Sequence, residues 1–325
     1  MDVVADLLQS ARARGSVLRQ VIQAPPWSVR YVSPPPLTLH AMLGGVGWII
    51  PDRAAPVSLA TGDIALTCGP ASYTVADDPS TPPSMVIRGI QDCSTADGTS
   101  LDEPAPVAPR TYGEPRNGAA MMVTGSYPAV SNVAERLLCG LPPVLYLPAA
   151  ESPRTLLALV ADEIAVDQPG QQIVLDRLID LLLVRTLRAW FARADTGAPG
   201  WYRAIGDEIV GPALRALHAR PAHPWTVAEL AATAGVSRAA LARRFTALVG
   251  QPPLTYLTSW RMSLAADLLH EPRSTITEVA RRVGYTDAFA FSTAFKRLRG
   301  ITPSAYRVTL SGNQSAPRTR RISQG

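Results

Sequence analysis

Metal chemistry needs clustered histidine and carboxylate ligands, and the first 200 residues hold a single histidine, His40. A catalytic metal site takes about three such ligands from one pocket. The sequence therefore argues against metal-dependent catalysis, and we expect no metal and no other cofactor. His40 has two interpretations: a packed or hydrogen-bonded core residue, or a contact for a bound small molecule.

Thiol chemistry has three candidates, Cys68, Cys93 and Cys139. Their odd number and the lack of CxxC spacing argue against both a disulfide framework and a zinc cluster. Cys68 and Cys93 are instead candidates for a response to an oxidant or electrophile. Cys93 lies in "RGIQDCSTADG", which we expect to be a partly exposed turn, although the adjacent Asp92 disfavours a reactive thiolate. Cys139, in "ERLLCGLPP", is expected to be an inert buried residue.

Charge divides the chain into two parts. Residues 1–199 hold 14 Arg and 19 acidic residues, a net charge of −5, whereas residues 200–325 hold 17 basic and 7 acidic residues, a net charge of +10. A basic half suits a polyanion such as a nucleic acid, and an acidic half is repelled by one. The two halves therefore predict different partners.

Membrane insertion is not expected. The longest apolar candidate, "LLLVRTLRAWF", is interrupted by Arg185 and Arg188, whereas a span needs about 18 or more apolar residues. The start, "MDVVADLLQS", carries acids where a secretory signal needs a basic flank. We therefore expect a cytoplasmic protein with no membrane partner.

The first half changes its periodicity near Pro153. Residues 25–125 contain short apolar runs between Pro- and Gly-rich turns, which predicts a unit of short strands, with residues 97–118 as an exposed loop. After Pro153 the apolar residues recur at helical spacing and are split at Pro169-Gly170, which predicts a helical hairpin. The second of these helices is apolar over a wide arc. We expect it to bury a face in a homodimer, although packing on the β unit fits the pattern equally well.

Two short helical units recur in the basic half, in "VAELAATAGVSRAALARRF" (227–245) and "VARRVGYTDAFAFSTAFKR" (279–297). Each has an Ala four residues before a Gly, and the apolar residues that follow match if the second turn has one extra residue. The small residue permits close helix packing, the Gly supplies a left-handed turn, and the apolar residues fix the angle. The pattern predicts two helix-turn-helix motifs, whose helices have suitable N-caps in Thr226, Ser237, Thr275 and Asp287.

The segment between the motifs, "PPLTYLTSWRMSLAADLLHE", is predicted to form one helix from Pro253 to Glu271. About 18 residues with a rise of about 1.5 Å each span roughly 27 Å, not far below the roughly 34 Å of one DNA turn. The second helices of the two motifs can therefore enter successive segments of the major groove on one face of a duplex. Such a protein recognises an asymmetric site without dimerising.

The block from Thr226 to Arg307 resembles the DNA-binding domain of the AraC/XylS family of bacterial transcription regulators. Its second half, "ITEVARRVGYTDAFAFSTAFKRLRGITPSAYR", follows the family signature, and "GITPSAYR" matches the family's Gly-x-x-Pro-x-x-Tyr-Arg ending. The first 200 residues resemble the cupin-type sensor domain of one branch of this family, through "LHAMLGGVGWI", "GDIAL", "DDPSTP" and "LPPVLYLP".

The resemblance implies an α+β chain in four parts. These are a cupin-like β-barrel sensor domain (1–152), the helical hairpin for dimerisation with its linker (153–200), an all-α DNA-binding domain with both motifs (201–310), and a disordered basic tail (311–325). The implied function is sequence-specific binding of double-stranded promoter DNA and activation through RNA polymerase, without enzymatic activity. One alternative is a cupin-type enzyme with an accessory DNA-binding domain, which the single histidine of that half speaks against. The other is an architectural DNA binder without an effector.

The resemblance also implies which residues meet DNA. The base-reading positions are Arg238, Ala239, Ala242 and Arg243 in the first motif, and Ala288, Phe289, Ala290 and Thr293 in the second. Arg243 is the best candidate for a bidentate contact to guanine, with a phosphate contact as its alternative. The second set is poor in hydrogen-bonding groups, so we expect thymine-methyl contacts there, and Phe289 has a core position as its alternative. Contacts to the DNA backbone are expected from Ser237, Arg244, Arg281, Arg282, Lys296, Arg297 and Arg299, or these arginines and the lysine are solvated charges.

In the sensor half, the resemblance implies a small organic effector inside the barrel, against His40, Trp48 and Tyr73. No spacing in the sequence identifies that effector. The signal is either such a molecule or an oxidant acting at Cys68 or Cys93.

Overall fold

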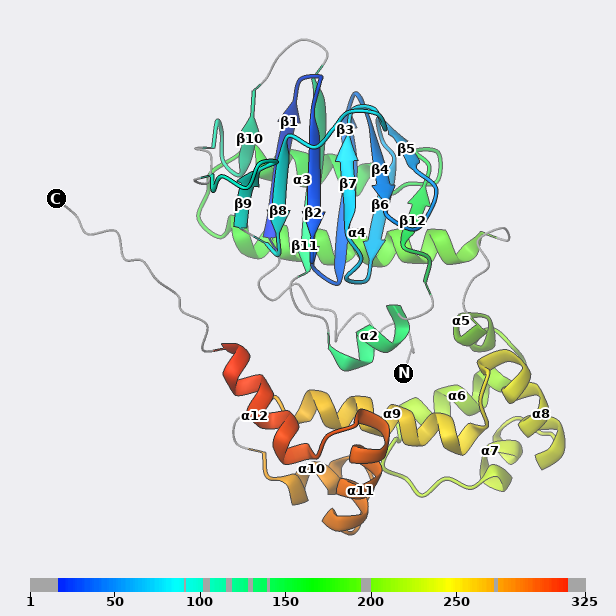
Figure 1. The fold of residues 1–325 in the computed structure, drawn as a ribbon. Coiled ribbons are helices and arrows are strands. Elements are labelled where there is room, and N and C mark those ends of the chain that lie inside the picture. The colour runs from blue at the N-terminus through cyan, green and yellow to red at the C-terminus, as the bar shows by residue number, and fades with distance from the viewer. Residues whose placement is uncertain are drawn as a thin grey trace. The chain divides into compact units, whose positions relative to one another are not determined.

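The computed structural model describes residues 17–90, 92–101, 106–114, 119–127, 131–138, 141–193, 200–271 and 274–314. The chain divides at Gly200 into two compact units. The N-terminal unit is made of strands and a few helices, and the C-terminal unit is helical (Figure 1). The predicted α+β architecture is therefore confirmed.

The N-terminal unit contains two six-stranded sheets. The first has the order β10-β1-β11-β3-β6-β12, with bounds Thr111–Gly113, Val17–Gln23, Ala120–Tyr127, Leu37–Gly44, Ile64–Cys68 and Val144–Leu147. The second has the order β5-β4-β7-β2-β8-β9, with bounds Val57–Ala60, Val46–Pro51, Tyr73–Ala76, Ser28–Val32, Met85–Arg88 and Asp92–Thr95. Within each sheet neighbouring strands are antiparallel, except for the parallel pairs β1–β10 and β2–β8. The expected exposed loop at 97–118 thus needs correction, because it contains β10, which pairs with β1.

The core of this unit lies between the two sheets. Because side chains alternate along a strand, each strand contributes every second residue to one face. The buried cluster on these inner faces draws on both sheets and comprises Trp27, Met42, Ile49, Leu59, Ala65, Tyr73, Val75, Ala120 and Met122. This arrangement is the expected cupin-like one.

The predicted helical hairpin consists of α3 (Arg154–Ile164) and α4 (Gln171–Ala192), which follow a short helix α2 (Asn132–Leu138). The break falls at Gly170, which has a positive φ of 87°. Helix α4 packs on the outer face of the first sheet, because a Cβ at Gly125 of β11 would lie 2.8 Å from the Ile179 side chain. Tyr127 also donates a hydrogen bond to the Ile179 carbonyl at 3.1 Å. Figure 1 shows both helices crossing behind the strands.

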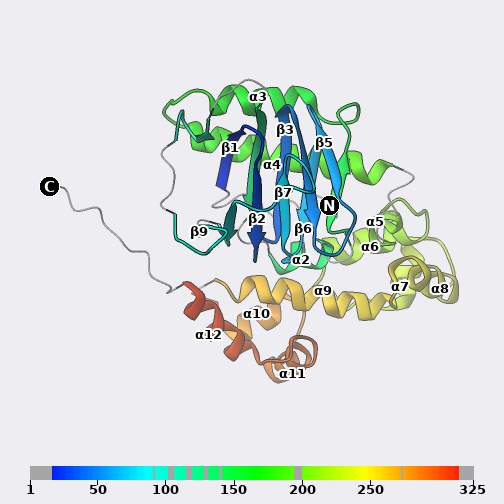
Figure 2. The ribbon, with the colours of Figure 1, turned by 45° about the horizontal axis from the view of Figure 1, so that its top comes forward.

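The C-terminal unit contains eight helices in its described residues, α5 to α12. Their bounds are Gly200–Ile205, Val210–Ala219, Val227–Thr233, Arg238–Val249, Pro253–Leu268, Ile276–Arg282, Ala288–Arg299 and Pro303–Gln314. Figures 1 and 2 place α7 and α8 toward one end of α9, and α10 and α11 toward the other. Both helix-turn-helix motifs, α7–α8 and α10–α11, are therefore present where the sequence predicts them.

Two predicted boundaries need correction. Helix α9 has 16 residues and ends at Leu268, not at Glu271, so its length is about 24 Å rather than roughly 27 Å. Helix α12 runs to Gln314, so the expected tail from residue 311 begins inside a helix. The rest of that tail, residues 315–325, lies outside the described residues. Within the described residues, we find no helix with the length and hydropathy to cross a membrane.

Candidate nucleic-acid interface

The second helix of each motif, here called a reading helix, is α8 in the first and α11 in the second, and both have 12 residues. Ser237 caps α8 by accepting a hydrogen bond from the Ala240 N–H at 3.2 Å. Asp287 caps α11 by accepting from the N–H groups of Phe289 and Ala290 at 3.1 and 2.9 Å. The predicted N-caps are therefore confirmed, and both helices begin one residue after them.

The two reading helices also share one packing register. Counted from the N-cap, their fourth and eighth residues are buried: Leu241 and Phe245 in α8, and Phe291 and Phe295 in α11. The second and sixth residues lie on the opposite side and are exposed, and the first residue, at the open N-terminal end of each helix, is exposed or half-buried. They are Arg238, Ala239 and Arg243 in α8, and Ala288, Phe289 and Thr293 in α11.

The outer face of α8 is basic. Arg238 and Arg243 are exposed, with Ala239 exposed and Ala242 half-buried beside them. A guanidinium presents parallel N–H groups that match the O6 and N7 acceptors of guanine. The geometry therefore allows α8 to donate hydrogen bonds to base edges.

The outer face of α11 is apolar. Phe289 is 80% exposed, which excludes the alternative that it belongs to the core. Ala290 and Thr293 are exposed next to it, and Ala288 is half-buried. Only Thr293 of these four side chains carries a hydrogen-bonding group, so this face is suited to thymine methyl groups rather than to polar base edges.

Two of the expected DNA-backbone contacts are engaged within the protein. Arg244 donates from Nε and Nη2 to one oxygen of Asp207, at 3.0 and 2.8 Å. Arg282 donates to Glu271 at 2.7 Å. Although partial burial acts to raise it, hydrogen bonds from the Val210 N–H and from Arg244 hold the pKa of Asp207 below its usual value. Arg244 therefore ties α8 to the start of α6 and is not simply a solvated charge.

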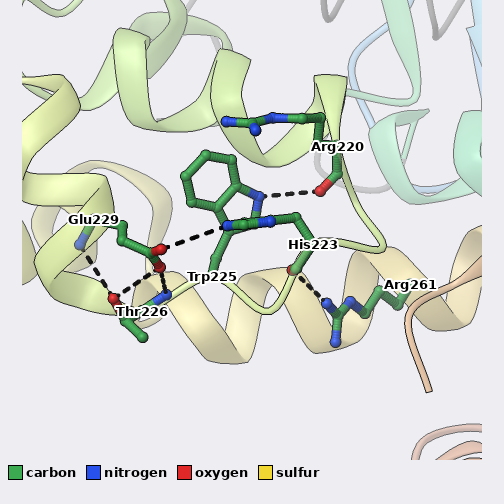
Figure 3. Close-up of polar contacts among 6 residues, drawn as sticks. All are labelled: Arg220, His223, Trp225, Thr226, Glu229 and Arg261. Atoms are coloured by element: carbon green, nitrogen blue, oxygen red, sulfur yellow. Dashed lines mark hydrogen bonds and ion pairs between the residues drawn. The ribbon is translucent and has the colours of Figure 1, made fainter. Parts of the chain in front are cut away.

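The loop before α7 is held by its own contacts (Figure 3). The Trp225 indole N–H donates to the Arg220 carbonyl at 3.0 Å, and the Arg220 guanidinium lies over the Trp225 ring, 4.6 Å from its centroid. Thr226 and Glu229 form a reciprocal capping box at the start of α7. Hydrogen bonds from the Thr226 backbone and side chain hold the pKa of Glu229 below its usual value. This loop therefore has a defined shape.

Arg261 of α9 contacts this loop from the other side. Its Nε donates to the Pro221 carbonyl at 2.7 Å, and its Nη2 donates to the His223 carbonyl at 2.8 Å. The same guanidinium lies 5.8 Å from the ring centroid of Tyr285, which is in the turn before α11. Partial burial lowers the pKa of Arg261, and Tyr285 opposes that change. The sequence pattern gives no indication of this role, although Arg261 and Asp267 are the only charged residues of α9.

The glycines of the two motif turns have different surroundings. Both have positive φ, 65° at Gly235 and 87° at Gly284, as the motif predicts. A Cβ at Gly235 would meet nothing within 4 Å, whereas one at Gly284 would lie 2.5 Å from the Ala222 carbonyl oxygen and 2.7 Å from its Cα. The turn of the second motif is therefore in backbone contact with the loop before the first.

In the N-terminal unit, His40 is a buried, hydrogen-bonded residue between the sheets. Its Nε2 lies 3.2 Å from the Tyr73 hydroxyl, and Tyr31 stacks on Tyr73 with ring centroids 4.9 Å apart. Burial lowers the pKa of His40 to about 3 and raises the pKa of Tyr31 to about 12. Within the described chain, no group hydrogen-bonds the His40 Nδ1. The structure therefore brings His40 and Tyr73 together, in their uncharged forms.

Trp48 does not join them. In β4, Ile49 belongs to the inner cluster, so its neighbour Trp48 points to the opposite face of the sheet. The expectation of one interior site for all three residues is therefore not met. A pocket does lie on the inner faces, but its volume is only about 20 Å³, and it is lined by Val21, Gln23, Trp27, Val29, Tyr31, Val75, Ala120 and Met122.

One of the two candidate sensor cysteines is less accessible than expected. Cys93 is buried in β9 rather than part of an exposed turn. Burial raises the pKa of the Cys68 thiol to about 12. Both settings disfavour a thiolate. Cys139 lies outside the described residues. Over the part of the chain that is described, no three His, Cys, Asp or Glu residues are grouped so as to hold a metal ion.

Known proteins resemble both units. A cupin family model matches residues 2–192, and a helix-turn-helix domain model matches residues 230–309. AraC-like transcription regulators of Streptomyces lividans and Streptomyces antibioticus are each 34% identical to this chain, over 312 and 315 residues, which cover 94% of this chain and 98% of each relative. Among solved structures, the DNA-binding domain of the global transcriptional factor AdpA, in complex with a target DNA, is 31% identical with a TM-score of 0.32, and the match covers 34% of this chain and 100% of that one.

Proposed function

The chain belongs to the AraC-like family of transcription regulators, and on that premise we propose that it binds promoter DNA with both reading helices on one duplex. One observation carries the proposal: α8 and α11 share length, cap position and packing register, and each exposes its outer face. Helices that are equivalent in this way can enter successive segments of a major groove from one rigid unit. The site they recognise is then asymmetric.

Each reading helix has its own role in this proposal. Arg243 and Arg238 donate to base edges, with Ala239 and Ala242 close to the same bases. Ala288, Phe289, Ala290 and Thr293 contact thymine methyl groups. Phosphate contacts come from Ser237, Arg281, Lys296 and Arg297, since Arg244 and Arg282 already pair with carboxylates. The first half of the site is therefore read by hydrogen bonds and the second half by shape and methyl contacts.

We assign dimerisation to α4. One face of α4 packs on its own sheet, yet Ile173, Val174 and Leu181 of the same helix are 67%, 43% and 45% exposed. These three apolar residues lie on one side of the helix around the exposed Arg177, and exposed apolar side chains grouped in this way are typical of a protein interface. The wide apolar arc of this helix then accounts for both expected contacts, packing on the β unit and burial in a homodimer.

We assign signal sensing to the N-terminal unit, where the chemistry of the buried groups favours a small uncharged molecule over an oxidant acting at Cys68 or Cys93. The buried His40 and Tyr73 offer neutral hydrogen-bonding groups beside stacked rings. The family relationship supports a cytoplasmic regulator without catalytic activity, which activates transcription through RNA polymerase.

The proposal is tested by selecting duplexes from a random pool with the full-length protein. The selected duplex should be bound about 1,000-fold or more tightly than a scrambled duplex. The logarithm of the affinity should fall linearly with the logarithm of the salt concentration, with a slope of about −0.9 per phosphate contact. Fluorescence anisotropy measures both quantities. Equal affinity for both duplexes would contradict sequence-specific recognition.

A further inference from the structure

Helix α9 is not the only connection between the two motifs. The loop from Arg220 to Trp225, which precedes α7, is in backbone contact with the turn at Gly284, because a Cβ there would lie 2.5 Å from the Ala222 oxygen. Arg261 adds a side chain to this contact by donating to the Pro221 and His223 carbonyls. Three segments that are far apart in the sequence therefore meet at one point.

Two of the three segments at this meeting point, the loop and the turn, lead directly into a helix of a motif. The loop ends at Thr226, the N-cap of α7, and the turn ends at Asp287, the N-cap of the reading helix α11. A displacement of the loop relative to the turn would therefore change the angle between the motifs. A 16-residue helix that acted as the sole tether would resist such a displacement only through the packing at its two ends.

The chemistry of the contact requires an arginine. A guanidinium can donate in two directions within its plane while its flat face lies against an aromatic ring. Arg261 does both, toward two carbonyls of the loop and toward the Tyr285 ring at 5.8 Å. Figure 3 shows it reaching the His223 carbonyl from α9. A lysine donates all three of its N–H groups from one nitrogen and has no flat face, so it cannot reproduce donation from two nitrogens in one plane together with the ring contact.

We propose that Arg261 is a positioning residue, which fixes the angle between the two reading helices and thereby the number of base pairs that the protein accepts between the halves of its site. This inference rests on the proposed function, because both helices must contact one duplex. One inserted base pair moves the second half-site by about 3.4 Å and rotates it by about 35°. Two motifs held at a fixed angle should lose affinity for a duplex with such an insertion, whereas two motifs that can move relative to each other should keep it.

The experiment uses the full-length protein and the selected duplex, a version with one base pair inserted between the halves, and a duplex with only the half that α8 contacts. The ratio of the Kd on the inserted duplex to the Kd on the original measures spacing discrimination. For the unaltered protein we expect a ratio of about 10 or more, in line with the typical cost of a faulty contact. For Arg261→Leu we expect a ratio below about 3 and an unchanged Kd on the half-site duplex. The ratio for Arg261→Lys should lie between those of the unaltered protein and Arg261→Leu.

Arg215→Leu is the matched control, because Arg215 is an exposed arginine of α6 that donates to the Ile205 carbonyl within the first half of the unit. Arg215→Leu removes the same charge, and its ratio of Kd values on the inserted and original duplexes should equal that of the unaltered protein.

An unchanged ratio in Arg261→Leu would overturn the inference. So would an equal loss on the half-site and full duplexes with a salt slope reduced by about one, since that result identifies a phosphate contact. If Arg261→Leu does not fold, Arg261→Lys decides the question by the same ratio. A ratio near one in the unaltered protein would contradict the coupled use of both reading helices, and thus the proposed function itself.

Discussion

The two helix-turn-helix motifs of the C-terminal unit share the same buried positions but differ in the residues that they expose. In both reading helices a large apolar residue is buried at the fourth and eighth positions after the N-cap. The outer positions differ, since α8 presents two arginines where α11 presents Ala288 and Thr293. Packing therefore constrains the inner positions of both helices equally, and the outer positions are free to give each motif its own specificity.

The turns differ as well, in a way that the motif pattern does not reveal. Gly235 faces open space, whereas Gly284 has the Ala222 backbone directly against it. The first glycine is needed for its backbone conformation alone, and the second for conformation and for space. The second motif is thus connected to the first by more than its position in the chain.

Substitution of the two turn glycines should give the largest difference between the motifs, measured as the loss in free energy of unfolding. Gly235→Ala places a side chain in a left-handed conformation, which costs about 1–2 kcal/mol. Gly284→Ala has the same cost and adds a backbone overlap, for which overpacking costs typically about 1–3 kcal/mol more. Calorimetry of the full-length protein measures both, through the transition of the C-terminal unit. Equal shifts for the two variants would mean that the contact with Ala222 relaxes at no cost.

Removal of an exposed side chain from each reading helix should show that the two motifs contact DNA by different chemistry. Arg243→Ala should weaken binding to the selected duplex by about 1–3 kcal/mol and relax the preference at one base pair. Phe289→Ala should cost less and should leave the hydrogen-bonded positions unaffected. Anisotropy titrations against duplexes with single base changes measure both effects.

Uracil in place of thymine supplies the control, since it removes only the methyl group. Its effect in the α11 half of the site should disappear in Phe289→Ala. An equal loss of affinity for Arg243→Ala on random DNA would identify Arg243 as a phosphate contact instead.

Lowering the pH should affect the cap of one reading helix and not that of the other, and this is the smallest of the expected effects. Hydrogen bonds from the Ala290 and Phe289 N–H groups lower the pKa of Asp287, so its cap is present above the ordinary pKa of about 3.9 and is lost as the pH falls through the lower, folded value. Ser237, the cap of α8, does not titrate. The amide chemical shifts of Phe289 and Ala290 should therefore change below about pH 4 while that of Ala240 stays constant, as measured by NMR. Asp287→Asn keeps a capping side chain, and it should abolish the titration.

Much of this unit was predictable because its signals are local. A cap, a turn glycine and a helical apolar period act within about ten residues, and so the sequence alone predicts the N-caps Thr226, Ser237, Thr275 and Asp287. The same holds for the break of the hairpin at Gly170. Helix ends were less predictable, and α9 ends three residues early, since the last turn of a helix depends on what packs beside it.

The contacts between distant segments were not predictable. Nothing in the pattern around Arg261 indicates that its partners are 40 and 38 residues away, or that Arg244 pairs with Asp207. Trp48 illustrates the same limit in the first unit, because the face on which a strand residue lies depends on the register of the whole sheet. Local periodicity identifies an element, and only the sheet or bundle decides what its residues touch.

The pocket between the sheets, with a volume of about 20 Å³, has room for about one water molecule. If an organic molecule binds in this pocket, lining side chains such as Trp27 or Met122 must move to admit it. A ligand that distinguishes two packings in this way shifts the balance between them by its difference in affinity. A pocket already large enough for such a molecule could be filled without this shift, so the small volume of this pocket would couple binding to a change in packing.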